Sequence, residues 1–172
     1  QNSVLENADL VFQDLQKIIS LLKEDIKEAR LFVNQAAPTL PELARELAKE
    51  TEAQKEKIQS IQKEQNSLVE KREDLEKLEK KQEKIGDSLE NFAKALRQEA
   101  NIQNLLDQEG REIARDSDDA AAIIEEREKD IEQKLSQAAD ARTIEEIKKE
   151  SDHTIQEQEK LIEELNLIAE HF

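Results

Sequence analysis

The chain lacks the residues on which several classes of protein depend. Its 172 residues include no Cys, Met, Trp or Tyr, only two Gly, two Pro and four Phe. Without Cys, a disulfide framework and a thiolate site for zinc or an iron–sulfur cluster are excluded. Two Gly are too few for a phosphate-binding loop together with the turns of an α/β enzyme. The longest apolar run, Ala120 to Ile124, is far too short to span a bilayer.

Charged residues are what the chain has in excess. They make up 40% of it, 42 acids against 26 bases, and give a net charge of −16, while apolar residues reach only 36%. High charge and few aromatic residues are typical of disorder. The dominant residues, however, are Ala, Leu, Ile, Glu, Lys, Gln and Arg, most of which are good helix formers. The periodicity of the apolar residues decides between disorder and long helices.

Apolar residues recur at steps of three and four along most of the chain, which predicts four long helices over residues 4–35, 41–85, 88–139 and 143–171. The first break is set by Pro38 and Pro41, which cannot both lie inside a helix. The second is placed at Gly86, because a capping-box pattern runs from Asp87 to Glu90. The last is placed before a second capping box, Thr143 to Glu146.

The third predicted helix contains the other glycine, Gly110. The four-three spacing continues through Gly110 and Ser117, and a single interior Gly costs only about 1 kcal/mol, so one uninterrupted helix is favoured. The alternative breaks the helix at Gly110 and restarts it at Asp116 or Ser117, where Asp118 and Asp119 would suit a first turn.

The first predicted helix carries the widest apolar stripe. Its seam residues are Ala8, Val11, Leu15, Ile18, Leu22, Ile26, Ala29 and Val33, and the residues that widen it are Leu5, Phe12, Ile19, Leu21, Leu31 and Phe32. A stripe of this width suits a helix that packs against more than one neighbour.

Short connections make consecutive helices antiparallel neighbours. The sequence therefore predicts an all-α fold: a single elongated antiparallel helical bundle with coiled-coil packing. The second helix has polar residues at seam positions, where they would fix register or partner choice. These residues are Thr51, Gln54, Gln65 and Arg72.

In this arrangement the first helix covers the second only as far as about Arg72, so residues 74–99 protrude from the bundle as a bare two-helix arm. Residues 70–84 hold six acids and six bases and little else. We expect the arm to be marginally stable alone and to act as a contact element. Its candidate interaction residues are Leu75, Leu78, Ile85, Leu89, Phe92 and Leu96.

The charge is unevenly distributed, since residues 86–172 carry −13 of the −16. Such a surface repels phosphate backbones, and no basic stripe or stacking aromatics compensate, so nucleic-acid binding is not expected. Anionic membrane surfaces are disfavoured for the same reason. The expected partner is a protein or another copy of the chain.

Few residues suggest chemistry. Glu150 and His153 have the Glu-x-x-His spacing of di-iron bundles, but the second copy that such a site needs is missing, because Ile168 precedes His171 by three. The acids of residues 116–119 lack the glycine and the distal glutamate of a calcium loop, so at most weak surface association of calcium is expected. No catalytic group, cofactor or metal site is predicted.

The function that suits this architecture is a non-catalytic structural or scaffolding role, exerted through helix-mediated self-assembly or protein contacts. The alternative is a helical sensor or adaptor bundle that binds a ligand or partner and relays a conformational shift. Lipid carriage ranks last, since the second and third helices have narrow apolar stripes. The first residue, Gln1, indicates a processed chain or an excised fragment.

Overall fold

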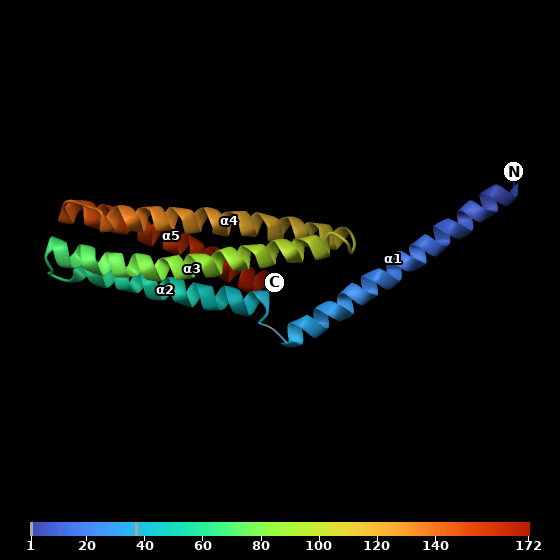
Figure 1. The fold of residues 1–172 in the computed structure, drawn as a ribbon, viewed down its shortest axis with the longest axis horizontal. Coiled ribbons are helices and arrows are strands. Elements are labelled where there is room, and N and C mark those ends of the chain that lie inside the picture. Colours follow the sequence, from blue (N-terminus) through green and yellow to red (C-terminus); the bar gives the residue numbers. More distant parts are fainter. Residues whose placement is uncertain (1, 37) are drawn as a thin grey trace.

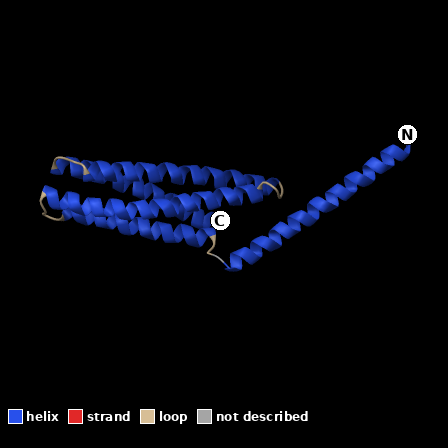
Figure 2. Cartoon of the chain, in the orientation of Figure 1, coloured by secondary structure: helices blue, strands red, loops and turns tan. Residues whose placement is uncertain are grey.

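The structure, a computed structural model, describes residues 2–36 and 38–172, and the surroundings of side chains in residues 3–29 and 38–172. These residues form five helices and no strand (Figure 2). The helices are α1 (Asn2–Ala36), α2 (Leu40–Lys63), α3 (Leu68–Gln103), α4 (Gln108–Ala139) and α5 (Ile144–His171). The predicted all-α fold is confirmed, with five helices instead of four. The predictions for Gln1 and for the side chains of Leu31, Phe32 and Val33 lie outside these described residues.

Helices α2 to α5 form an antiparallel four-helix bundle (Figure 1). α3 packs along α2 and α4, and α5 packs along α4 and α2, so the four helices close into a ring. Short connections at residues 64–67, 104–107 and 140–143 reverse the chain at alternate ends of the bundle. The predicted antiparallel packing with short connections is therefore confirmed for this part of the chain.

A side-chain cap begins each bundle helix. Thr39 Oγ1 accepts from the Glu42 backbone N–H, the Glu42 carboxylate accepts from the Thr39 N–H, and Pro41 lies in the first turn. Ser67, Asp107 and Thr143 accept in the same way from the N–H groups three residues further on. Each cap satisfies a backbone donor that has no partner within the helix. The boundaries predicted near Pro38 and Thr143 are confirmed to within two residues.

The predicted reversal at Gly86 is wrong, because α3 runs through Gly86 without a break. Ser88, which follows the expected cap residue Asp87, donates its hydroxyl to the Lys84 carbonyl at 3.2 Å inside the helix. The chain reverses at residues 64–67 instead, and Ser67 caps the next helix. The expected helix over 41–85 is therefore two helices, α2 and the first half of α3.

The predicted helix over 88–139 is also two helices. It breaks at residues 104–107, and neither alternative at Gly110 is correct, since Gly110 lies in the first turn of α4 under the Asp107 cap. Ser117 lies within α4 with its side chain fully buried. The seam spacing that suggested continuity is real, because Gly110 and Ser117 both face the bundle interior; the break falls between two helices that share one seam.

The bare arm predicted for residues 74–99 does not exist. These residues form the middle of α3, which packs between α2 and α4. Leu75, Leu89 and Leu96 have no exposed surface, Leu78 and Phe92 are buried, and Ile85 is half-buried. The extra reversal at residues 64–67 supplies α3 with neighbours on both sides, which the four-helix arrangement had denied it.

The first helix does not cover α2 as expected. α1 extends away from the bundle beyond Pro38 (Figure 1) and packs along none of the four bundle helices. The reversals at residues 64–67 and 104–107 replace the single reversal predicted at Gly86, so the chain beyond Pro38 contains four helices instead of three. These four close the ring without α1.

Candidate interaction surface

The exposed apolar face of α1 is the most prominent surface feature of the described residues. Ten large apolar side chains of α1 are each more than half exposed. They are Val4, Leu5, Leu10, Val11, Phe12, Leu15, Ile18, Ile19, Leu21 and Leu22. Contiguous apolar surface of this kind marks a site of contact with another molecule.

Most of these side chains form one continuous stripe. In heptad notation, Val4, Val11 and Ile18 take position d, Leu15 and Leu22 take position a, and the adjacent e positions are Leu5, Phe12 and Ile19. An apolar face of three positions in seven is the pattern of a helix whose face is buried in a bundle. Below Leu22 the stripe weakens, since Asp25 occupies the next d position.

The polar face of α1 is divided by charge. Residues 1–16 contain three acids and no base, namely Glu6, Asp9 and Asp14. Residues 17–30 contain four bases and three acids, so their net charge is +1. The helix therefore has an acidic N-terminal half and a weakly basic C-terminal half.

The bundle has a different candidate feature, a polar layer in its core. The buried apolar residues divide into two clusters, one around Leu89, Ile124 and Leu165 and the other around Ile58, Leu75 and Leu135. Buried polar residues lie between the clusters along three helices. They are Thr51 and Gln54 on α2, Gln82 on α3, and Ser151, Thr154 and Gln158 on α5.

Some of these polar groups are satisfied by backbone carbonyls. The hydroxyls of Thr51 and Thr154 donate to the carbonyls four residues earlier, each at 2.8 Å. The Gln54 amide donates to the Leu78 carbonyl of α3 at 3.2 Å. The prediction of polar seam residues is thus confirmed for Thr51 and Gln54, whereas Gln65 is exposed in the α2–α3 connection.

Two buried amides have no partner among the described residues. The side chains of Gln82 and Gln158 are 1% and 0% exposed, and neither the nitrogen nor the oxygen of either makes a hydrogen bond there. Unpaired buried polar groups cost free energy, typically about 1–3 kcal/mol each. The layer therefore lowers the stability of the bundle.

Two carboxylates of α4 lie against α3 next to the polar layer. The Oε1 atoms of Glu128 and Glu132 lie over Gly86 of α3, where a β-carbon would come within 2.5 and 2.7 Å of them. Burial, together with the hydrogen bond and the charge of Glu132, raises the pKa of Glu128 to about 7. Gly86 is thus a point of close approach of two helices and not a turn residue.

Ion pairs tie neighbouring bundle helices together at the rim of the core. Arg127 of α4 bonds Glu157 of α5 at 3.0 Å, and Arg97 of α3 makes a bidentate pair with Glu125 of α4. The hydrogen bond from Arg97 lowers the pKa of Glu125. Hydrogen bonds from Lys160 and Arg127 lower the pKa of Glu157, against the opposing effect of its burial.

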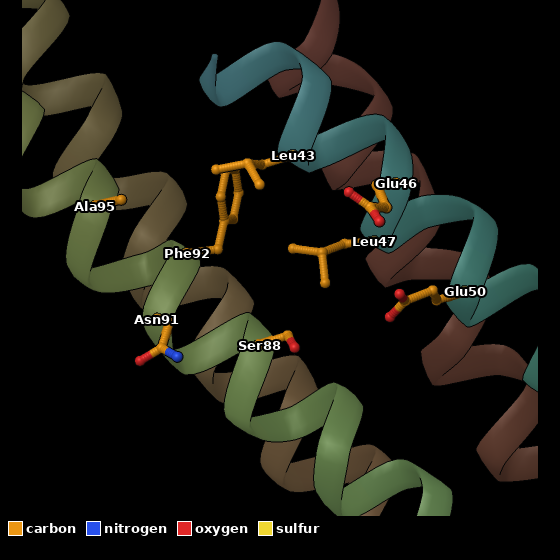
Figure 3. Close-up of a pocket in the computed structure, with 8 residues that line it drawn as sticks. All are labelled: Leu43, Glu46, Leu47, Glu50, Ser88, Asn91, Phe92 and Ala95. Atoms are coloured by element: carbon orange, nitrogen blue, oxygen red, sulfur yellow. The ribbon is translucent and has the colours of Figure 1, made fainter. Parts of the chain in front are cut away.

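A surface groove lies between α2 and α3, near the end where α1 joins (Figure 3). Its volume is about 290 Å³, with Leu43, Leu47 and Phe92 along its apolar part and Glu46 and Glu50 on its α2 rim. Asn91 and Ser88 come from α3. No pair of these side chains has the arrangement of a nucleophile and its base.

The residues that the sequence suggested for metals lie on α4 and α5. Glu150 and His153 lie one turn apart on α5, with 3.7 Å between carboxylate oxygen and Nδ1, and no third ligand joins them. Asp116, Asp118 and Asp119 are exposed on α4. In the part of the chain that the structure describes, no three His, Asp or Glu residues are grouped to hold a metal ion. Within it no helix is long and apolar enough to cross a bilayer.

The candidate arm residues are divided between the two apolar clusters of the bundle. Leu75 and Leu78 belong to one apolar cluster, while Leu89, Phe92 and Leu96 belong to the other, with Ile85 packed against it. The wide stripe of α1 is evident in the sequence, but its exposure is not. A signal that was missed is the Ser67-Leu68-Val69-Glu70 capping pattern, which marks the start of α3.

Comparison of the chain with family models, with curated proteins and with solved structures gives no match.

Proposed function

We propose that this protein is a non-catalytic structural or scaffolding element, in which the bundle is a rigid body and α1 is the helix through which the chain associates with other protein. One observation carries this proposal: ten large apolar side chains of α1 are more than half exposed. Burying a large apolar side chain gains about 1.5–3 kcal/mol, so even partial coverage of this stripe is strongly favourable.

The independence of the bundle from α1 supports the proposal. The bundle closes its own core with α2 to α5, and the described part of α1 adds nothing to that core. An isolated helix gains little stability from propensity alone, and most helices are stabilised by packing of an apolar face. A 35-residue helix with such a face is therefore best explained as a helix whose apolar face packs against another molecule.

The test measures the mass of the full chain in solution by light scattering over a range of concentrations. Leu15→Glu/Leu22→Glu places two charges in the stripe and should return the assembly to a monomer. The matched control is Gln13→Glu/Ser20→Glu, which adds the same charge at the same spacing on the polar side of α1 and should leave the assembly intact. Equal masses for the wild-type chain and the stripe variant would contradict the proposal.

A second candidate function, sensing by the bundle, is favoured by the unpaired amides of Gln82 and Gln158. A polar layer with unsatisfied groups is where the packing of four helices is least firmly fixed, so a ligand or partner could select between two packings there. The discriminating measurement is the response to Gln82→Leu/Gln158→Leu. A scaffold keeps its association with other protein when the layer is made apolar. A sensor instead loses the change in bundle packing that its ligand or partner produces.

A further inference from the structure

The charge division of α1 selects an orientation for the contact. Resting on the proposed function, we propose that α1 pairs antiparallel with α1 of a second copy of this chain, with the centre of the pair between Gln16 and Lys17. The acidic half of each helix then faces the weakly basic half of the other. A parallel pair would instead bring the three acids of residues 1–16 beside their own copies.

The apolar residues support this register. With the centre between Gln16 and Lys17, Leu15 faces Ile18 of the second copy and Val11 faces Leu22. Both are layers of one a residue against one d residue, as in antiparallel coiled coils.

Charged residues at the edge of the stripe also match. Asp9 and Lys23 both flank the e-position side of the stripe, two heptads apart. In the antiparallel pair, Asp9 of each copy comes within one residue of being level with Lys23 of the other. Because a two-fold interface repeats every contact, the pair forms twice.

The geometry of the chain leaves room for the pair. The first described residue of the second α1 would lie level with residue 31, before α1 ends at Ala36. α1 extends away from the bundle, so the two bundles lie at opposite ends of the pair (Figure 1). Neither bundle obstructs the other helix.

A lipid surface is a poorer occupant of the same face. Helices that lie in a membrane interface are rich in Lys and Arg on the polar side. Residues 1–37 contain six acids and four bases, and the whole chain carries −16. Anionic lipid would therefore repel the protein to which the apolar face belongs.

The test uses disulfide cross-linking of the full chain, whose native sequence has no cysteine to interfere. One variant carries Val11→Cys and the other Leu22→Cys. Each is oxidised alone, and the two are oxidised after mixing. Light scattering of each reduced variant shows that it still has twice the 19.8 kDa of one chain. A disulfide requires Cα atoms within about 7 Å, so only residues that face each other are linked.

The antiparallel pair predicts a cross-linked dimer from the mixture and almost none from either variant alone. Cross-linking of each variant with itself would show a parallel pair and overturn this inference, while association through α1 would stand. Association without any cross-link in the three samples would overturn the register in the same way. A monomeric mass, with the chain floating on neutral phosphatidylcholine vesicles, would overturn both the pair and the proposed function.

Charge exchange gives an independent check of the pairing. Lys23→Glu should weaken the dimer, because the introduced carboxylate then faces Asp9 of the second copy. Asp9→Lys/Lys23→Glu should restore it, because the attraction returns with its sign reversed. These residues lie fourteen positions apart on one helix, so a restoring effect requires contact between copies. Failure of the exchange to restore a weakened dimer would contradict the antiparallel register.

Discussion

Gly86 of α3 lies directly beneath the carboxylate of Glu128 on α4, and a β-carbon there would come within 2.5 Å of Glu128 Oε1. None of the described glycines has a positive φ angle, so neither is required for a left-handed turn. Gly86 permits two helices and two carboxylates to come together in the middle of the bundle. Gly110 has a different neighbour, the backbone carbonyl of Gln103, which would lie 2.3 Å from a β-carbon.

The two glycines should therefore respond oppositely to alanine. At Gly86 the obstructing atoms are ends of flexible side chains, so Gly86→Ala should keep or raise the free energy of unfolding, by up to about 1 kcal/mol of helix propensity. At Gly110 a backbone atom obstructs, so Gly110→Ala should lower it by about 1–3 kcal/mol. Urea denaturation of both variants measures the difference. A loss of stability at Gly86 as large as that at Gly110 would show that the carboxylates of Glu128 and Glu132 cannot move aside from an added β-carbon.

Gln158→Leu should stabilise the bundle. The substitution removes a fully buried amide whose nitrogen and oxygen are both unpaired and leaves a side chain of similar size, so a gain of about 1–3 kcal/mol is expected. Gln54→Leu is the matched control, and it should gain less because it loses the bond to the Leu78 carbonyl. Thermal and urea unfolding report both effects. If the two variants gain equally, the missing hydrogen bonds of Gln158 are not the cause.

The raised pKa of Glu128 predicts a pH dependence of stability. Because the folded protein holds this proton more tightly than the unfolded chain, whose ordinary value is 4.5, stability contributed by the protonated form is lost as pH rises from about 4.5 to about 7. The carboxylate is only partly buried, and solvent screening reduces the effect to the order of 1 kcal/mol. Glu132 and Glu90 raise the pKa of Glu128, and Lys129 opposes them.

Glu128→Gln tests this dependence, because glutamine keeps the shape and cannot ionise. The variant should exceed the wild-type chain in stability at pH 8 and lose that advantage by pH 4. Glu126→Gln, at an exposed position on the same helix, is the control and should show little change between the two pH values. A constant difference between Glu128→Gln and the wild-type chain at all pH values would show that protonation of Glu128 does not contribute to the pH dependence of stability.

The helical class and the ends of α1 and α5 could be predicted because each rests on a local signal. Pro38 and Pro41 interrupt any helix, and Thr143 caps one. The interior reversals could not be separated by local signals, since Ser67 to Glu70 and Asp87 to Glu90 both resemble helix starts. The choice was made by tertiary packing: a four-helix ring places Leu75, Leu78 and Leu89 in its core, whereas a reversal at Gly86 would leave them half covered.

The charge-rich segment at residues 70–84 shows why composition misled the prediction. Only two or three residues in every seven of a bundle helix must face the core. Leu75, Leu78 and Gln82 fill those positions. Lys71 is only 6% exposed, and its ammonium group donates a hydrogen bond to the Gln62 carbonyl at 3.4 Å. Likewise, the stripe of α1 was visible in the sequence, but its exposure depends on how many other helices close the bundle.

Hydrogen exchange of backbone amides tests the central claim, that α1 and not the middle of α3 makes the contact. At low concentration, amides of residues 4–29 should exchange fastest, because nothing covers their apolar face, and they should slow several-fold or more as the chain associates. Amides of residues 74–99 should stay protected at every concentration. In Leu15→Glu/Leu22→Glu, the protection of residues 4–29 should no longer depend on concentration. Protection of α1 that is equal in the dilute chain, the concentrated chain and this variant would contradict the account.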